Sequence, residues 1–258
     1  MSFSIALQSE LLKTKRTAAF WLSVAGAALI PTLFALVYIF NTNEVAPGME
    51  VKAWEQHFMR GWQSLSTFLL PMYIILISTL IPQIEYKNNT WKQVFASPQS
   101  TAQIYFSKLV TLHLMILTCY ILFTLLMLAT GVVADVASPK FKFLENAVPW
   151  KSMLALNVRT YLSVLGIAAL QYGLSLRFKN FVAPVGIGLA LLIASLIAYG
   201  FQWQHIDKMP YAHPALTLAS ILKEQSFHLA THEWWAIGFF VLFTAAGFFD
   251  LLWRKEKG

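Results

Sequence analysis

The amino-acid sequence predicts an all-α membrane protein with six transmembrane helices, an N-terminal amphipathic helix at the membrane interface, and both termini in the cytoplasm. The composition is the first reason, because 57% of the residues are apolar and only 12% are charged, about half the ~25% charged share of soluble domains. The second reason is a series of six long apolar stretches, and the third is the placement of Lys and Arg between them. This composition excludes a water-soluble globular domain and a disordered chain.

The N-terminal segment, residues 1–17, is predicted to be an interfacial helix. Apolar residues such as Phe3, Leu7 and Leu11 recur at helical spacing, and positive charges gather in the stretch from Lys13 to Arg16. A helix of this kind lies on a membrane surface with its basic end at the anionic headgroups. A basic tail that only sets the topology is the alternative interpretation.

Six apolar stretches follow, each near the ~20 residues that a helix needs to cross the hydrocarbon core. They are residues 18–40, 64–84, 109–133, 160–176, 181–201 and 234–253. The first is longer than the core of a signal peptide, so we interpret it as an uncleaved span. The fourth is the shortest, because Asn157 and Arg159 stand at its start. With no linker or repeat in view, residues 1–258 are predicted to form a single transmembrane domain.

The orientation follows from the basic residues. If the N-terminus is cytoplasmic, the inner segments hold the larger share of the 19 Lys and Arg residues, although they are shorter than the outer segments. Lys and Arg are enriched in cytoplasmic segments of membrane proteins. The net charge of +7 is therefore explained by the orientation of the chain in the membrane, and no nucleic-acid partner is expected.

The predicted inner loop from Glu85 to Lys108 is longer than a simple connection needs, as the short connection from Arg177 to Asn180 shows. Thr90 is predicted to cap a short helix, and Ser100 to cap the helix that enters the third span. The aromatic residues of the short helix would form a surface suited to a partner protein; a helix that only anchors the loop is the alternative. The residues predicted to contact the partner are Glu85, Thr90, Trp91, Lys92, Val94, Phe95 and Pro98.

The outer segment, residues 202–233, contains a weak candidate for a metal site. Glu224, His228 and His232 would share one face of a helix, if the segment is helical. Zinc and copper sites need further ligands and supporting groups, so this pattern is not specific. The favoured interpretation is an amphipathic helix that dips into the outer interface, with no metal bound.

Catalytic motifs are missing from the sequence. It contains no G-x-x-x-x-G-K-[ST] phosphate loop, no H-E-x-x-H and no G-x-S-x-G. We therefore predict no catalytic residue, no bound cofactor and no ATP hydrolysis by this chain.

The inner loop resembles that of ABC transporter permeases of the type-two exporter class. Such loops have an acidic residue at the end of the second span, a threonine or small residue five places on, an apolar helix, a proline, and a lysine that opens the third span. Here these positions are Glu85, Thr90, Pro98 and Lys108. The six spans and the length are also similar, most of all to the permeases of bacitracin and lantibiotic immunity transporters. One departure is Asn89, where glycine is common.

The resemblance implies a permease that dimerises with itself or a similar chain and binds a separate cytosolic ATPase, which holds the ATP. Residues 85–100 would be the coupling helix, residues 2–17 a connecting helix, and residues 210–232 outer re-entrant helices. The substrate would be a peptide, an antibiotic or a lipid-like amphipathic compound, exported across the inner membrane of a bacterium-like cell. The alternatives are a membrane-embedded metal-dependent enzyme that uses the outer histidines, and a non-transporting membrane anchor or sensor.

Overall fold

The computed structural model describes residues 2–48, 52–223 and 228–253. Within these residues the secondary structure consists of helices, with no β-strand, as predicted. Six helices are long and apolar enough to cross a membrane, and the six predicted stretches fall on them. They are Ala18–Phe40 (α2), Ala53–Asn88 (α4, η2 and α5), Thr101–Ala137 (α7), Trp150–Arg177 (α8), Val182–Gly200 (α9) and Thr231–Trp253 (α11).

Short helices connect these six. The helix α1 spans Phe3–Thr14, within the predicted interfacial segment. The other connecting elements are α3 (Thr42–Val45), η1 (Ala46–Gly48), α6 (Trp91–Ala96), η3 (Pro139–Phe141), η4 (Ile206–Lys208), η5 (Pro210–Ala212) and α10 (His213–Lys223). The second of the six long helices consists of α4 (Ala53–Ser64), η2 (Leu65–Leu69) and α5 (Leu70–Asn88).

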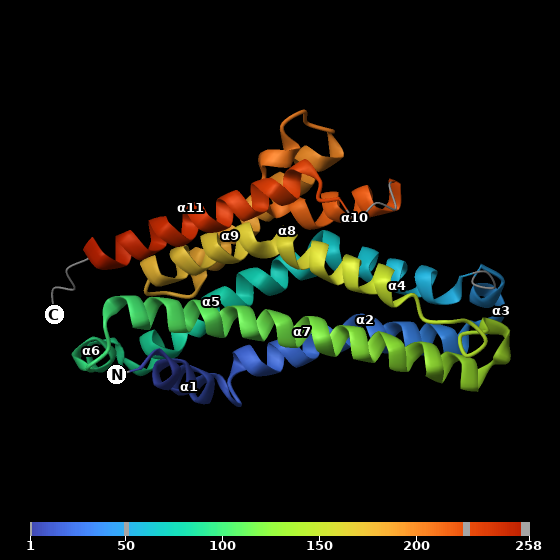
Figure 1. Ribbon diagram of the computed structural model, residues 1–258, viewed down its shortest axis with the longest axis horizontal. Helices are drawn as coiled ribbons and strands as arrows, with labels where there is room; N and C mark the ends of the chain where they lie inside the picture. Colours follow the sequence, from blue (N-terminus) through green and yellow to red (C-terminus); the bar gives the residue numbers. More distant parts are fainter. Residues whose placement is uncertain (1, 49–51, 224–227, 254–258) are drawn as a thin grey trace.

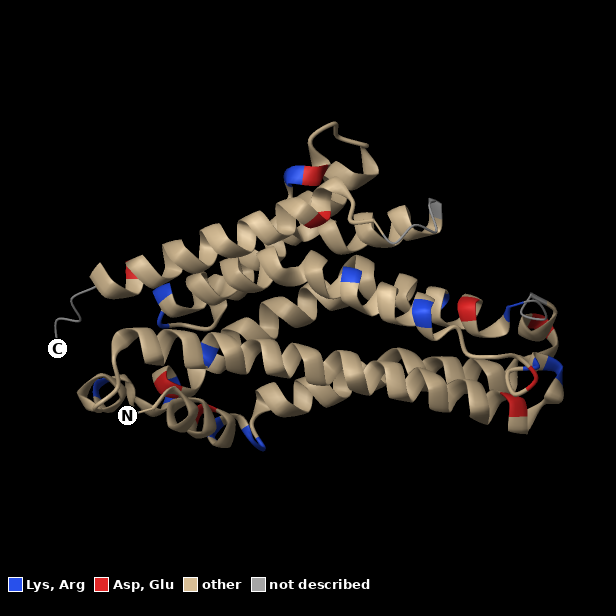
Figure 2. Ribbon diagram, in the orientation of Figure 1, with Lys and Arg blue, Asp and Glu red and all other residues tan. Residues whose placement is uncertain are grey.

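The helices form an elongated bundle (Figure 1). At one end lie α1, α6, the connection between α8 and α9, and the last turns of α11; we call this the α6 end. The other end carries α3 and the connection from α7 to α8. Charged residues gather near the two ends, and a smaller group lies between them on α4, α8, η4 and the start of α11 (Figure 2). The first described helix, α1, and the last turns of α11 thus lie at the same end, as an even number of crossings requires.

The second predicted span is part of a longer, interrupted helix. Its central segment, Leu65–Leu69, is a π-helical turn that leads into α5. Pro71 follows in the first turn of α5 and has no N–H to donate. Wide turns of this kind accommodate such a defect in a helix. The second span is thus divided into α4 toward one end of the bundle and α5 toward the α6 end.

The longest helix, α7, has 37 residues and extends beyond both limits of the predicted third span. Its start is fixed by a complete capping box: the Ser100 hydroxyl accepts a hydrogen bond from the Gln103 amide, while the Gln103 side chain accepts one from the Ser100 amide. The prediction that Ser100 caps this helix is confirmed. At ~1.5 Å per residue, α7 reaches from the α6 loop to the opposite end of the bundle.

Candidate functional site: the charged cluster beside α6

The loop predicted to bind a partner is a tight helix–turn–helix. Asn89 adopts a left-handed conformation, with φ of 54°, and ends α5. The Thr90 amide then donates to the Glu85 carbonyl at 3.0 Å, the hydrogen bond of a Schellman-type helix end. Asparagine is one of the few residues other than glycine that adopts this conformation readily. Asn89 therefore adopts the left-handed conformation for which similar loops commonly have a glycine at this position.

Thr90 precedes α6 as predicted, but its side chain makes no capping hydrogen bond. Its backbone has φ of −94° and ψ of −1°, whereas a capping residue has extended geometry. The reason is that the Thr90 amide is already used to close α5. The turn that ends one helix thus fixes the conformation in which the next begins.

The aromatic residues of α6 are divided between the interior and the surface. The Trp91 side chain is only 7% exposed; its ring stacks on Phe95 at 5.5 Å and contacts Tyr86 at 5.2 Å. Val94 and Phe95 are half-buried, while Lys92 and Pro98 are exposed. Trp91 therefore attaches α6 to the bundle. The accessible surface of the loop is formed by Lys92, Val94, Phe95 and Pro98 instead.

Beneath α6 lies a cluster of four charged side chains contributed by three helices. Glu85 from α5 accepts a hydrogen bond from Lys108 of α7 at 2.6 Å and from Lys13 of α1 at 3.1 Å. Glu10 of α1 accepts from the same two lysines, at 2.6 Å each. The Lys108 ammonium also lies 5.5 Å from the centre of the Trp91 ring. We call Glu10, Lys13, Glu85 and Lys108 the four-charge cluster.

The charges of the four-charge cluster are buried, so they must be neutralised by one another rather than by water. The side chains of Glu85 and Lys108 are each 1% exposed, so neither charge can be solvated by bulk water. Two carboxylates and two ammonium groups balance each other, as buried charges require. Burial by itself lowers the pKa of Lys13, but the hydrogen bond and charge of Glu10, together with Glu85, outweigh it and raise that pKa. Lys13 therefore stays protonated and keeps the cluster neutral.

Two of the four residues of this cluster stand out in the sequence. Glu85 and Lys108 were singled out as the residues that flank the loop, but their direct contact was not predicted. Glu10 and Lys13 were missed, because α1 was interpreted by its apolar residues. In the structure the buried face of α1 is formed by Ala6, Glu10 and Thr14. The signal in the sequence is Glu10, a single acid among apolar residues and about one helical turn before Lys13.

Two of the three candidate metal residues are described, and they lie in different segments of the chain. Glu224 lies outside the described residues, and His228 is exposed in a non-helical stretch just before α11, so it does not share a helix with His232. The His232 side chain is buried and hydrogen-bonded to the Thr217 hydroxyl at 2.9 Å. Within the described part of the chain, no group of three or more His, Cys, Asp or Glu residues could hold a metal ion.

A second buried ion pair, which the sequence analysis missed, attaches α10 and α11 to α8. The Arg159 guanidinium donates to both carboxylate oxygens of Glu233, at 2.9 and 3.2 Å, and to the Ser220 hydroxyl at 2.9 Å. Nearby, His213 is hydrogen-bonded to the Asp207 carbonyl, and burial lowers the pKa of His213 to about 4. The segment implied to be re-entrant is thus fixed at its base by buried polar contacts.

Comparison with known proteins gives one match. The family described as ABC-2 family transporter protein matches residues 6–195. This range runs from within α1 to within α9 and contains the four-charge cluster and α6. No curated protein and no solved structure gives a significant match.

Proposed function

The chain belongs to the ABC-2 family of transporter proteins, and from that membership we propose that it is the permease subunit of an ATP-driven exporter. It is an integral membrane protein, and ABC-2 permeases generally dimerise and work with an ATPase subunit. For this chain we propose a dimer with itself or a similar permease, and a separate cytosolic ATPase that binds and hydrolyses the ATP. The proposed location is the inner membrane of a bacterium-like cell.

The observation that carries the proposal is the four-charge cluster beside α6. It joins the N-terminal helix, the end of the second span and the start of the third span into one unit. Separating any of these helices would leave a buried charge without its partner, which costs several kcal/mol. Trp91 links α6 to this unit, because its ring contacts Tyr86 of α5 and lies beneath the Lys108 ammonium of α7, so we expect a force applied to α6 to be passed to both helices. This is the mechanical property that a coupling helix needs.

We propose that the ATPase contacts the accessible surface of α6, formed by Lys92, Val94, Phe95 and Pro98, while Trp91 fixes α6 to the bundle. The α6 end would then face the cytoplasm, together with both termini. Fusion of a reporter domain after Asn180 tests this orientation, since that connection lies at the α6 end. A periplasmic signal from the fusion would overturn it.

For the substrate we propose a peptide, an antibiotic or a lipid-like amphipathic compound. The support is the scarcity of charges in the six spanning helices, each of which has an 18-residue window with no more than two Asp, Glu, Lys or Arg residues; such a path suits a molecule with a large apolar part better than a small ion. The closer resemblance to bacitracin and lantibiotic immunity permeases leads to the same expectation. Resistance of cells to a panel of such compounds, with and without the chain, measures the specificity.

The decisive experiment is to purify the chain from native membranes and identify a copurifying protein that carries a phosphate loop. The test variant is Lys92→Glu, which reverses a charge on the exposed side of α6. A matched control is Lys151→Glu, an exposed lysine in the first turn of α8 at the other end of the bundle. We expect Lys92→Glu to reduce ATPase copurification and resistance at equal membrane abundance, and Lys151→Glu to leave both unchanged. Equal copurification by the two variants would refute the coupling assignment.

A further inference from the structure

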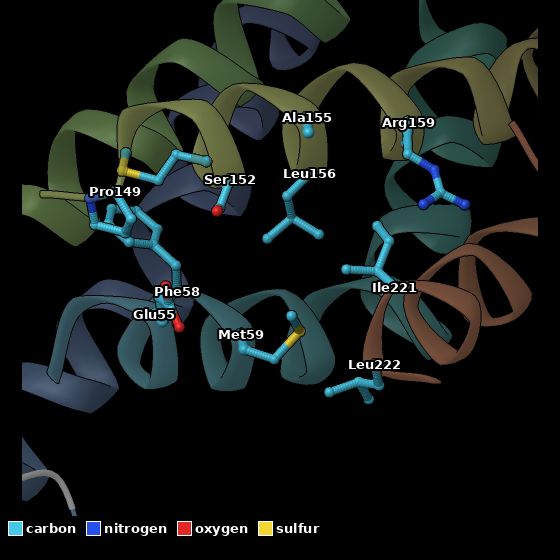
Figure 3. Close-up of a pocket in the computed structure, with 11 residues that line it drawn as sticks. Glu55, Phe58, Met59, Pro149, Ser152, Ala155, Leu156, Arg159, Ile221 and Leu222 are labelled. Carbon is cyan, nitrogen blue, oxygen red and sulfur yellow. The ribbon is translucent and has the colours of Figure 1, made fainter. Parts of the chain in front are cut away.

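A cavity of about 330 Å³ lies between α4, α8 and α10, away from the four-charge cluster. This volume is at the lower end of the ~300–1,000 Å³ of small-molecule sites. In Figure 3, Phe58 and Met59 of α4 face Leu156 of α8, while Ile221 and Leu222 of α10 close one side. The walls are therefore mostly apolar, and Met59 gives one of them an adaptable shape.

The two ends of the cavity differ in the charge that they offer. Arg159 lines one end, but its charge is already paired with Glu233, which is fully buried. At the other end lies Glu55 (Figure 3). Its only described ion pair is with Lys52 at 3.2 Å, and the two side chains are 38% and 61% exposed. Such a pair is worth ~0–1 kcal/mol, so another cation can replace Lys52 at little cost.

We propose that this cavity binds a small cationic amphipath, with its apolar chain between α4 and α8 and its ammonium group at Glu55. An anionic ligand is disfavoured, because Glu55 would repel it and the charge of Arg159 is already paired with that of Glu233. A neutral amphipath would make the same apolar contacts with the walls but would lack the ion pair with Glu55. Binding in the cavity is inferred from these charges and walls, and the further step, that the exported substrate has a positive head, rests on the proposed function.

The position of the cavity connects its occupant to α10. Ile221 and Leu222 line it, and Ser220, one residue before them, accepts a hydrogen bond from Arg159. A bound chain therefore contacts α10, the helix that the Arg159–Ser220 hydrogen bond attaches to α8. Occupancy of the cavity should stabilise α10 in its present position.

The test measures binding of radiolabelled dodecylamine to the chain in phosphatidylcholine nanodiscs, with excess unlabelled dodecylamine defining the saturable part. Glu55→Gln removes the charge and keeps the shape, and Glu44→Gln is its control, an exposed acid in α3 outside the cavity. Ala155→Phe fills the cavity, and Leu154→Phe is its control, because Leu154 is 66% exposed on the same helix. Unlabelled dodecanol and dodecyl sulfate serve as neutral and anionic competitors.

We expect Glu55→Gln to weaken dodecylamine binding about fivefold, equivalent to ~1 kcal/mol, and Ala155→Phe to abolish the saturable part. Both controls should bind as the parent does, and dodecyl sulfate should compete least. Equal competition by dodecyl sulfate, or parental binding by Glu55→Gln, would overturn the proposal, as would saturable binding that survives Ala155→Phe. No ATPase is present in this assay, so a negative result here leaves the coupling proposal standing, and failure of ATPase copurification does not affect the binding result.

Discussion

Removal of the Lys108 charge should destabilise the protein more than removal of the Glu85 charge, although the two side chains are bonded to each other. In Lys108→Gln, the carboxylates of Glu10 and Glu85 remain buried and share only Lys13, whose side chain is 34% exposed. Breaking a buried pair by removing one partner costs ~3–5 kcal/mol. In Glu85→Gln, both lysines keep Glu10 at 2.6 Å, so the cost falls to that of a charged hydrogen bond, ~1.5–3 kcal/mol.

The double variant Glu85→Gln/Lys108→Gln separates a true cluster from two independent sites. It leaves Glu10 and Lys13 as a neutral pair, so its cost should fall short of the sum of the two single costs by ~0.5–3 kcal/mol. Each kcal/mol corresponds to about 2–4 °C in the melting temperature for a chain near this size. Lys108→Gln should therefore melt roughly 10 °C below the parent.

Tryptophan fluorescence during heating of the detergent-solubilised protein measures these shifts. The control is Arg177→Gln, which removes the ion pair between Arg177 and Asp250. The side chain of Arg177 is 58% exposed and that of Asp250 is 39% exposed. An exposed pair contributes no more than ~1 kcal/mol. If Lys108→Gln melts no lower than Arg177→Gln, or if the two cluster variants are additive, the four charges do not act as one unit.

Three further predictions concern other parts of the bundle. Glu233→Gln should cost ~3–5 kcal/mol, because it leaves Arg159 buried without a counter-charge; a melting temperature equal to that of the parent would contradict this. Acidification should loosen α10: the folded-state pKa of His213 is about 4 against 6.5 for the free side chain, so the unfolded state takes up the proton first as the pH falls. The stabilisation is complete above pH 6.5 and is lost toward pH 4, by up to ~3 kcal/mol, which hydrogen exchange in α10 measures. Trp91→Ala should increase proteolysis of α6 at unchanged membrane insertion, whereas the half-buried Phe95→Ala should increase it less.

The transmembrane helices could be predicted from the sequence because their signal is local. A run such as Ala18–Phe40 must be a helix in the membrane, since its backbone polar groups have no water to bond. The limits were less accurate where the chain continues in helical form outside the apolar run. The helix α7 continues to Ala137, past the charged Asp135, and the second span begins in α4, whose polar residues include Glu55 and Arg60.

The position of the loop helix was also predictable, whereas the orientation of its side chains was not. Ser100 and Gln103 are three residues apart and contain the whole capping box, so sequence alone locates the start of α7. Whether Trp91 faces a partner or the bundle depends on the space that Tyr86, Phe95 and Lys108 leave for it. That space is set by the angle at which α5 leaves the turn at Asn89, and no local pattern specifies this angle.

The four-charge cluster shows why the remaining part of the site needed the structure. Glu10 and Lys108 are 98 positions apart, and each taken singly is consistent with a charge at the membrane interface. Their burial is explained only by the packing of α1 against α7, which lets Lys108 form ion pairs with both Glu10 and Glu85. A lone acid at the end of an apolar span and a lone lysine at the start of the next do indicate a pair, because neither charge is stable there alone. The second pair, contributed by α1, is itself neutral and bonds to both charges of the first, so it joins the N-terminal helix to α5 and α7 and makes it part of the proposed coupling unit.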